Sequence, residues 1–306
     1  MVNALEMRSG LYNYTNDPEV ATTLDTDPAK VWTPLELLDI AFAHPPNRPP
    51  GTDYEYSNTN YALLGLVIEK AGGQPLATAM RDRLFAPLVM KDTLLPVSTS
   101  NSIPMPFAHG YLYGSSSVAM YGEPEYTAQT SAAVDAGTLR PTDYTAVNHS
   151  FATAAGGVVS TADDLVTWMQ ALTGGKVLNP EYQRIWEAGI RPEVPDEPHQ
   201  EYGYGISRMS WGPNVVTYHG GETAGCNSFM GVDTANAMTL VVWTTLPVSL
   251  DNKPTANTLA VHNLDQIYVQ SPLAPAPTPA PSTPCAQPAD APGADADIPV
   301  NARCGS

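Results

Sequence analysis

The feature that most constrains the fold of this chain is a change in hydrophobic pattern near Gly203. Before it, apolar residues recur at the three- and four-residue intervals of amphipathic helices. After it come NVVTYHGG, SFMGVD and MTLVVWTT, short runs rich in β-branched and aromatic residues with Gly, Asn and Asp between them. A last segment, LAVHNLDQIYV, returns to helical spacing. This order predicts a mixed α+β fold, with a small antiparallel sheet flanked by helices and a helical, loop-rich region.

Two helices are expected in succession in the first third of the chain. The first is capped by Asn58 or Thr59 and ends at the glycine pair that begins with Gly72. The second is opened by Pro75 and stopped by Pro87.

A third helix follows the sequence AAGGVVS, where Thr161 and Asp164 fit a capping box ahead of an apolar stripe. Between the second and third helices, residues 98–147 are rich in Ser, Thr, Gly, Pro and Tyr without a sustained period. We expect long loops there.

Composition changes again after residue 270, where Pro, Ala, Ser and Asp dominate and large apolar residues almost vanish. Such a segment cannot bury enough surface to offset its ordering entropy. The chain is therefore expected to form one domain over 1–270 and a disordered Pro/Ala-rich tail over 271–306, either a wall-spanning spacer or an end without a role. Cys285 and Cys304 in the tail would pair in an oxidising compartment, and Cys226 is expected to be a small buried hydrophobic residue.

Composition also excludes several classes of function. The 14 Lys and Arg against 31 Asp and Glu give a net charge of −17, which disfavours nucleic acid and anionic lipid as partners. No apolar run approaches the roughly 18 residues of a membrane span, and the chain as given shows no signal peptide. P-loop and G-x-G-x-x-G motifs are lacking, so no cofactor is expected. No metal site is expected either, because ligand spacing is missing among His44, His109, His149 and His199.

One candidate for chemistry is the loop Tyr56-Ser57-Asn58, which feeds directly into a helix N-terminus. A phenol beside an amide there could transfer a proton and orient a substrate, and the helix dipole would favour negative charge. The alternative is a tyrosine packed under a capping Ser or Asn.

A second candidate is His219 at the end of an expected strand, followed by Gly220 and Gly221. Glycines there would let a ligand approach the strand edge, where backbone N–H groups could hold an oxyanion. The alternative is an ordinary strand-end turn.

Six blocks in order carry a family resemblance: EMRSGLYNYT, PPGTDYEYSNTNYALLGLVIEKAGGQP, RLFAPLVMKDT, AAGGVVSTADDL, YGYGI and YHGGETAG. From about Leu5 to about Val269 the chain resembles the serine beta-lactamase-like, penicillin-binding family of class C beta-lactamases, D-alanyl-D-alanine carboxypeptidases and related esterases. The resemblance implies a serine hydrolase that works through an acyl-enzyme on a D-Ala-D-Ala peptide, an ester or a beta-lactam. It also implies a bacterial protein of the cell envelope or a secreted one.

The resemblance assigns roles by position. Tyr56 would handle the proton, and Asn58 would orient the acyl side chain. His219 with Gly221 would form the strand-edge element, and the backbone N–H of Glu222 would be one of two oxyanion donors. The serine between Tyr56 and Asn58 would then be structural. A histidine where many relatives carry lysine favours esterase or peptidase activity over lactam hydrolysis.

The sequence departs from the family pattern at the nucleophile, because it contains no S-x-x-K. The residues three before its five lysines are Asp27, Val67, Leu88, Thr173 and Leu250. In the family the nucleophile precedes the block EMRSGLYNYT by a few tens of residues, and here that block is at the start. We therefore expect the chain to lack the N-terminal part of the fold and to be inactive as given. The competing interpretation is a non-catalytic module that binds peptide or penicillin.

Overall fold

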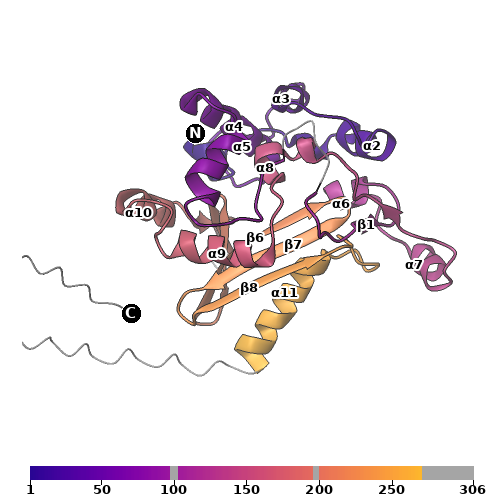
Figure 1. Cartoon of the computed structure of the whole chain (residues 1–306). Coiled ribbons are helices and arrows are strands. Elements are labelled where there is room, and N and C mark those ends of the chain that lie inside the picture. Colours follow the sequence, from indigo (N-terminus) through magenta and orange to yellow (C-terminus); the bar gives the residue numbers. More distant parts are fainter. Residues whose placement is uncertain (97–102, 196–199, 271–306) are drawn as a thin grey trace, which may run out of the picture. The chain divides into compact units, whose positions relative to one another are not determined.

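A computed structural model of the chain describes residues 1–96, 103–195 and 200–270 (Figure 1). The predicted tail and its two cysteines lie outside these residues. The α-helices are α1 (Val2–Leu5), α2 (Pro18–Thr26), α3 (Pro34–Phe42), α4 (Asn58–Gly72), α5 (Leu76–Met80), α6 (Ser117–Tyr121), α7 (Ala128–Asp135), α8 (Thr153–Gly156), α9 (Ala162–Thr173), α10 (Pro180–Ala188) and α11 (Thr255–Asp265). Short 3-10 turns cover Tyr14–Asn16 and His149–Phe151, and π turns cover Arg81–Phe85 and Gln266–Gln270.

The strands form one antiparallel meander and one small two-stranded pair. The meander runs in chain order through β3 (Arg191–Pro192), β4 (Gln200–Gly203), β5 (Ile206–Trp211), β6 (Asn214–Thr223), β7 (Cys226–Asp233) and β8 (Met238–Thr244), and the pair is β1 (Tyr111–Leu112) with β2 (Thr142–Asp143). The predicted antiparallel sheet is therefore confirmed.

Helices cover both faces of the sheet, with α9 on one side of β6–β8 and α11 on the other (Figure 1). Alternation along the strands makes this possible, because successive side chains point to opposite faces. Phe229 packs with Leu264 of α11, whereas the neighbouring Met230 packs with Met169 of α9. The sheet is buried between two apolar helix faces, as the mixed fold prediction requires.

A separate helical core lies in the first half of the chain, built around the fully buried side chains of Tyr14 and Leu37 and the nearly buried Trp32. Helix α4 contacts α3 and α8 within it. The approach of α4 to α8 requires a glycine, because a Cβ on Gly65 would come within 2.7 Å of the Ala154 Cβ. This core fixes the N-terminal end of α4, where the Tyr56 loop ends.

The predicted helices are confirmed at α4, at α5 with its π turn, and at α9, whose N-cap Thr161 accepts from the Asp164 N–H at 3.4 Å. Gly73 ends α4 in the left-handed conformation, at φ 64°. The predicted cap of α4 is wrong. The N-cap is Ser57, and the side chain of Asn58 donates to Thr15 Oγ1 instead.

Two other expectations are wrong. Residues 98–147 are not loops throughout, because the described part of this stretch contains α6 and α7 as well as β1 and β2. Cys226 is exposed rather than buried, because it is the first residue after the two-residue turn between β6 and β7.

None of the helices in the described residues combines the length and apolar character that crossing a membrane demands.

Candidate active site

The Tyr56 loop is held by a second stretch of chain about 45 residues earlier. The backbone N–H of Glu55 donates to the Met7 carbonyl at 2.8 Å, and the hydroxyl of Thr59 donates to the Tyr12 carbonyl at 2.7 Å. The Asn58 N–H donates to Asn13 Oδ1 at 3.0 Å. Two of the blocks that carry the family resemblance therefore pack together, and Tyr56 projects from their junction.

Three aromatic rings from distant parts of the sequence meet at this point. The Tyr56 ring centroid lies 6.4 Å from that of His219 and 6.1 Å from that of Tyr202. The Tyr202 and His219 centroids are 6.0 Å apart, in an edge-to-face arrangement. The structure thus brings together the two residues that the sequence predicted as catalytic, and it adds Tyr202 to them.

Tyr56 keeps 40% of its surface exposed, so a ligand can reach it. Partial burial nevertheless raises the pKa of its hydroxyl above the ordinary value of 10. The phenol is therefore protonated at pH 7 and can donate a hydrogen bond. Before it could accept a proton in catalysis, a neighbouring cation would have to lower that pKa.

His219 is held by its own backbone. Its Nδ1 lies 2.5 Å from the Gly220 carbonyl, so this nitrogen donates and Nε2 is left as an acceptor, 3.5 Å from the Tyr202 hydroxyl. Burial lowers the pKa of the imidazole, against the opposing effect of the hydrogen bond to Gly220. His219 is therefore neutral at pH 7 and supplies no fixed positive charge.

His219 lies where β6 extends beyond its neighbour β5. The last β5 residue paired with β6 in this direction is Ser207, which lies opposite Tyr218. Within the described residues, the stretch from His219 to Thr223 pairs with β7 alone. Because N–H and C=O groups of an antiparallel strand point alternately to its two sides, this stretch offers backbone hydrogen bonds to an extended ligand.

The two glycines after His219 lie close to side chains of β7 and α11. A Cβ on Gly221 would lie 2.8 Å from Ser228 Oγ. A Cβ on Gly220 would lie 3.1 Å from Oδ1 of Asn257 in α11. A larger residue at either position would have to displace a side chain of the neighbouring strand or helix. Ligand access comes from the free edge of β6.

Glu222 has the most perturbed carboxyl group of this edge, because burial raises its pKa from 4.5 to about 7. Its nearest polar contact is the Asn227 Nδ2, at 3.4 Å. The side chain of Asn227 is buried and also donates to the Gly221 carbonyl at 3.0 Å, while its Oδ1 accepts from the Ala256 and Asn257 N–H groups. Asn227 thus fixes this edge of β6 to the start of α11.

Asn58 and Ser57 are placed differently from each other. Asn58 is half-buried, and its Nδ2 donates to Thr15 Oγ1 at 3.1 Å. Ser57 is buried, and its hydroxyl donates weakly to the Tyr12 carbonyl at 3.4 Å. The substrate-binding role expected for Asn58 stays a prediction.

Tyr202 is the site residue that the sequence did not single out. Its side chain is buried, and its hydroxyl lies 3.5 Å from His219 Nε2. Burial raises its pKa far above the ordinary value. Tyr202 lies in the block YGYGI, which contributed to the family resemblance, but nothing local distinguishes it from the other tyrosines.

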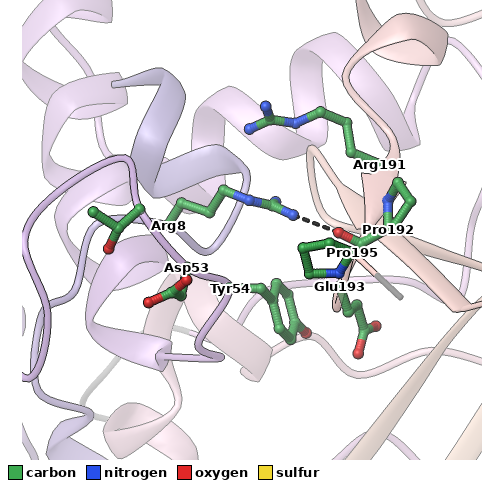
Figure 2. Close-up of a pocket in the computed structure, with 8 residues that line it drawn as sticks. Arg8, Asp53, Tyr54, Arg191, Pro192, Glu193 and Pro195 are labelled. Atoms are coloured by element: carbon green, nitrogen blue, oxygen red, sulfur yellow. Dashed lines mark hydrogen bonds between the residues drawn. The ribbon is translucent and has the colours of Figure 1, made fainter. Parts of the chain in front are cut away.

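A cavity of about 350 Å³ opens next to this aromatic cluster (Figure 2). It lies between the loop around Tyr54, the Met7–Leu11 segment that carries Arg8, and the chain from β3 to Pro195. Tyr54 joins the cavity to the cluster, because its ring centroid is 5.5 Å from that of Tyr202. Figure 2 shows the Arg8 guanidinium reaching the Pro192 carbonyl, with Tyr54 and Glu193 close together below it.

The family model described as Beta-lactamase matches residues 2–264. The chain belongs to this family. Among solved structures it resembles a D-stereospecific amidohydrolase from Streptomyces sp., with a TM-score of 0.72 and 26% identity over 88% of this chain and 72% of that one. The mixed α+β fold expected from the sequence is the fold of this amidohydrolase.

Two further proteins are similar to this chain, one in structure and one in sequence. A D-amino acid amidase from Ochrobactrum anthropi SV3, solved with D-phenylalanine, has a TM-score of 0.61 and 29% identity over 80% of this chain and 64% of its own. A D-aminopeptidase of Gluconobacter oxydans (strain 621H) is 24% identical over 180 residues. That match spans 58% of this chain and 29% of the D-aminopeptidase. The chain thus covers less than a third of that relative's length.

No group of three or more His, Cys, Asp or Glu side chains in residues 1–96, 103–195 and 200–270 is arranged to hold a metal ion.

Proposed function

We propose that this chain forms the acyl-transfer site of a serine hydrolase that cleaves amides or short peptides of D-amino acids. The observation that carries the proposal is the convergence of Tyr56 and His219, 6.4 Å apart, at the free edge of β6. An extended acyl group could pair with that edge while the Tyr56 hydroxyl faces its scissile bond. The preference for D-substrates is taken from the amidohydrolase and amidase that the chain resembles.

In this proposal Tyr56 passes a proton between the attacking hydroxyl and the leaving amine. Because burial raises its pKa, it requires the cation that the lysine of an S-x-x-K motif supplies in the family. The 306 residues contain no such motif. His219 is neutral and cannot replace that lysine. The chain therefore provides the proton-handling and strand-edge side of the site, and an S-x-x-K serine is needed for turnover.

The proposed activity is tested on the native gene product, purified from its own cells. Intact-mass analysis after exposure to a fluorophosphonate should show one adduct, and D-phenylalanine amide should be hydrolysed faster than the L-isomer. The absence of both an adduct and turnover would refute the hydrolase.

A second candidate is a binding module that holds D-peptides without cleaving them. The absence of S-x-x-K from these residues is the observation that favours it. It predicts a rise in melting temperature with D-Ala-D-Ala peptides and no turnover of a chromogenic ester. Both candidates agree with a cell-envelope or secreted location, which is proposed by analogy with the family.

A further inference from the structure

Met7 adopts a backbone conformation that its side chain disfavours. Its φ is 53°, in the left-handed region where a Cβ is crowded. It lies two residues after the end of helix α1 (Val2–Leu5), at a position where glycine commonly ends a helix. The side chain is nevertheless a methionine, and only 1% of its surface is exposed. Such strain persists only where the surrounding structure fixes the residue, so the contacts of Met7 call for an explanation.

Met7 holds the chain on both sides of Tyr56. Its backbone carbonyl accepts from the N–H of Glu55 at 2.8 Å, and its sulfur accepts from the N–H of Ser57 at 3.4 Å. Glu55 and Ser57 are the two chain neighbours of Tyr56. One residue therefore fixes the peptide units that lead into and out of the tyrosine.

The same sulfur has a second donor, the Nδ2 of Asn60 at 3.3 Å. The Asn60 side chain is fully buried, and its Oδ1 has no hydrogen-bond partner among the described residues. A leucine would fill a similar volume without a buried, unpaired acceptor, so stability alone does not account for an amide at this position. The bond between the Asn60 amide and the sulfur limits the positions that the sulfur can take.

We propose that Met7 is a positioning residue for Tyr56 and that its sulfur sets the direction of the phenol in the acyl-transfer site. The inference rests on the proposed function, because it concerns the proton transfer assigned to Tyr56. A thioether is a weak acceptor, but here it pairs the N–H of Ser57, a residue that is 1% exposed. If carbon replaces the sulfur, the Tyr56 loop has to shift before that N–H can find another acceptor. Because a proton-transfer group must lie within hydrogen-bond reach of its partner, a small shift of the phenol should slow catalysis.

The test replaces the sulfur and keeps the packing. Met7→Leu has a similar volume and no acceptor, and such exchanges in a core are usually tolerated. In the native gene product it should lower kcat for D-phenylalanine amide about tenfold and leave KM within about twofold, because the phenol acts in the transition state. The control is Met169→Leu, at a methionine fully buried between α9 and the sheet, and it should change neither constant. An unchanged kcat in a folded Met7→Leu enzyme, or equal losses in both variants, would overturn the inference.

A spectroscopic measurement tests the position of Tyr56 without turnover. In the full chain with isotope-labelled tyrosine, the ring resonance of Tyr56 is assigned by its absence from Tyr56→Phe. The rings of Tyr202 and His219, at centroid distances of 6.1 and 6.4 Å, shift this resonance away from that of free tyrosine. Met7→Leu should move it back toward the free value, and Met169→Leu should not. A resonance that Met7→Leu leaves in place would contradict the positioning role.

A second variant applies if Met7→Leu does not fold. Asn60→Leu removes one donor to the sulfur and keeps the bond from Glu55 to the Met7 carbonyl. It should lower kcat several-fold, again without raising KM. An unchanged kcat, with or without a rise in KM, would overturn the inference.

The two proposals fail in different measurements. If the unmodified native gene product shows neither adduct nor turnover, the hydrolase is refuted, and the Tyr56 resonance alone decides whether Met7 positions this tyrosine. If the native product hydrolyses the amide and Met7→Leu matches it, the hydrolase stands and the positioning role is refuted.

Discussion

The carboxyl group of Glu222 should make the stability of this fold depend on pH. Its pKa is raised from 4.5 to about 7 by burial. Between these two values the folded state binds more protons than the unfolded state, so the free energy of unfolding falls as pH rises. The destabilisation is absent below about pH 4.5 and complete above about pH 7. A tenfold change in proton affinity is worth about 1.4 kcal/mol, which gives about 3 kcal/mol for this group.

The substitution Glu222→Gln removes this ionisation and keeps an oxygen that can accept from the Asn227 amide. It should stabilise the chain by about 3 kcal/mol at pH 8 and leave it nearly unchanged at pH 4.5. Urea unfolding followed by circular dichroism at the two pH values measures the difference. Glu125→Gln, at an exposed glutamate, is the matched control and should stay within about 0.5 kcal/mol at both. A gain of the same size at both pH values, or a loss at pH 8, would refute the reasoning.

Three other substitutions test the framework around the site by urea unfolding. Asn227→Ala removes the side chain that joins β6 to the start of α11 and should cost about 3 kcal/mol, and a cost under about 1 kcal/mol would show that this link is dispensable. Gly203→Ala would place a Cβ 2.0 Å from the Gly189 carbonyl oxygen, so the variant should lose its near-ultraviolet circular dichroism, and a native spectrum would contradict this packing. Tyr14→Phe leaves the Phe151 carbonyl without its 2.7 Å donor inside the helical core and should cost about 1–2 kcal/mol, whereas an unchanged midpoint would exclude that bond.

The sheet and its covering helices could be predicted because each leaves a periodic signal in the sequence. Strands β6 to β8 bury alternate residues against α9 and α11. Both of these helices carry apolar stripes that face the sheet. Helix α7 left no such signal, because none of its residues is buried. Its only local sign is the capping box of Thr127 and Thr130.

The site could be predicted only in part, because local sequence does not determine tertiary partners. Asn58 and Thr59 are good capping residues by type, but their side chains bond to Thr15 and to the Tyr12 carbonyl, so the helix begins after Ser57. Tyr202 entered the aromatic cluster for the same reason. Its position beside Tyr56 follows from how β4 packs against the helical region, which no spacing in the sequence expresses.

The central claim is that the Tyr56 hydroxyl takes part in acyl transfer at the edge of β6. The most direct test measures kcat/KM for hydrolysis of a D-amino acid amide by the native gene product and by its Tyr56→Phe variant. The control is Tyr182→Phe, at a tyrosine on α10 that is 58% exposed. Loss of a proton-transfer group predicts a decrease of at least about 100-fold for Tyr56→Phe and less than about twofold for the control. Full activity in a correctly folded Tyr56→Phe protein would contradict the account.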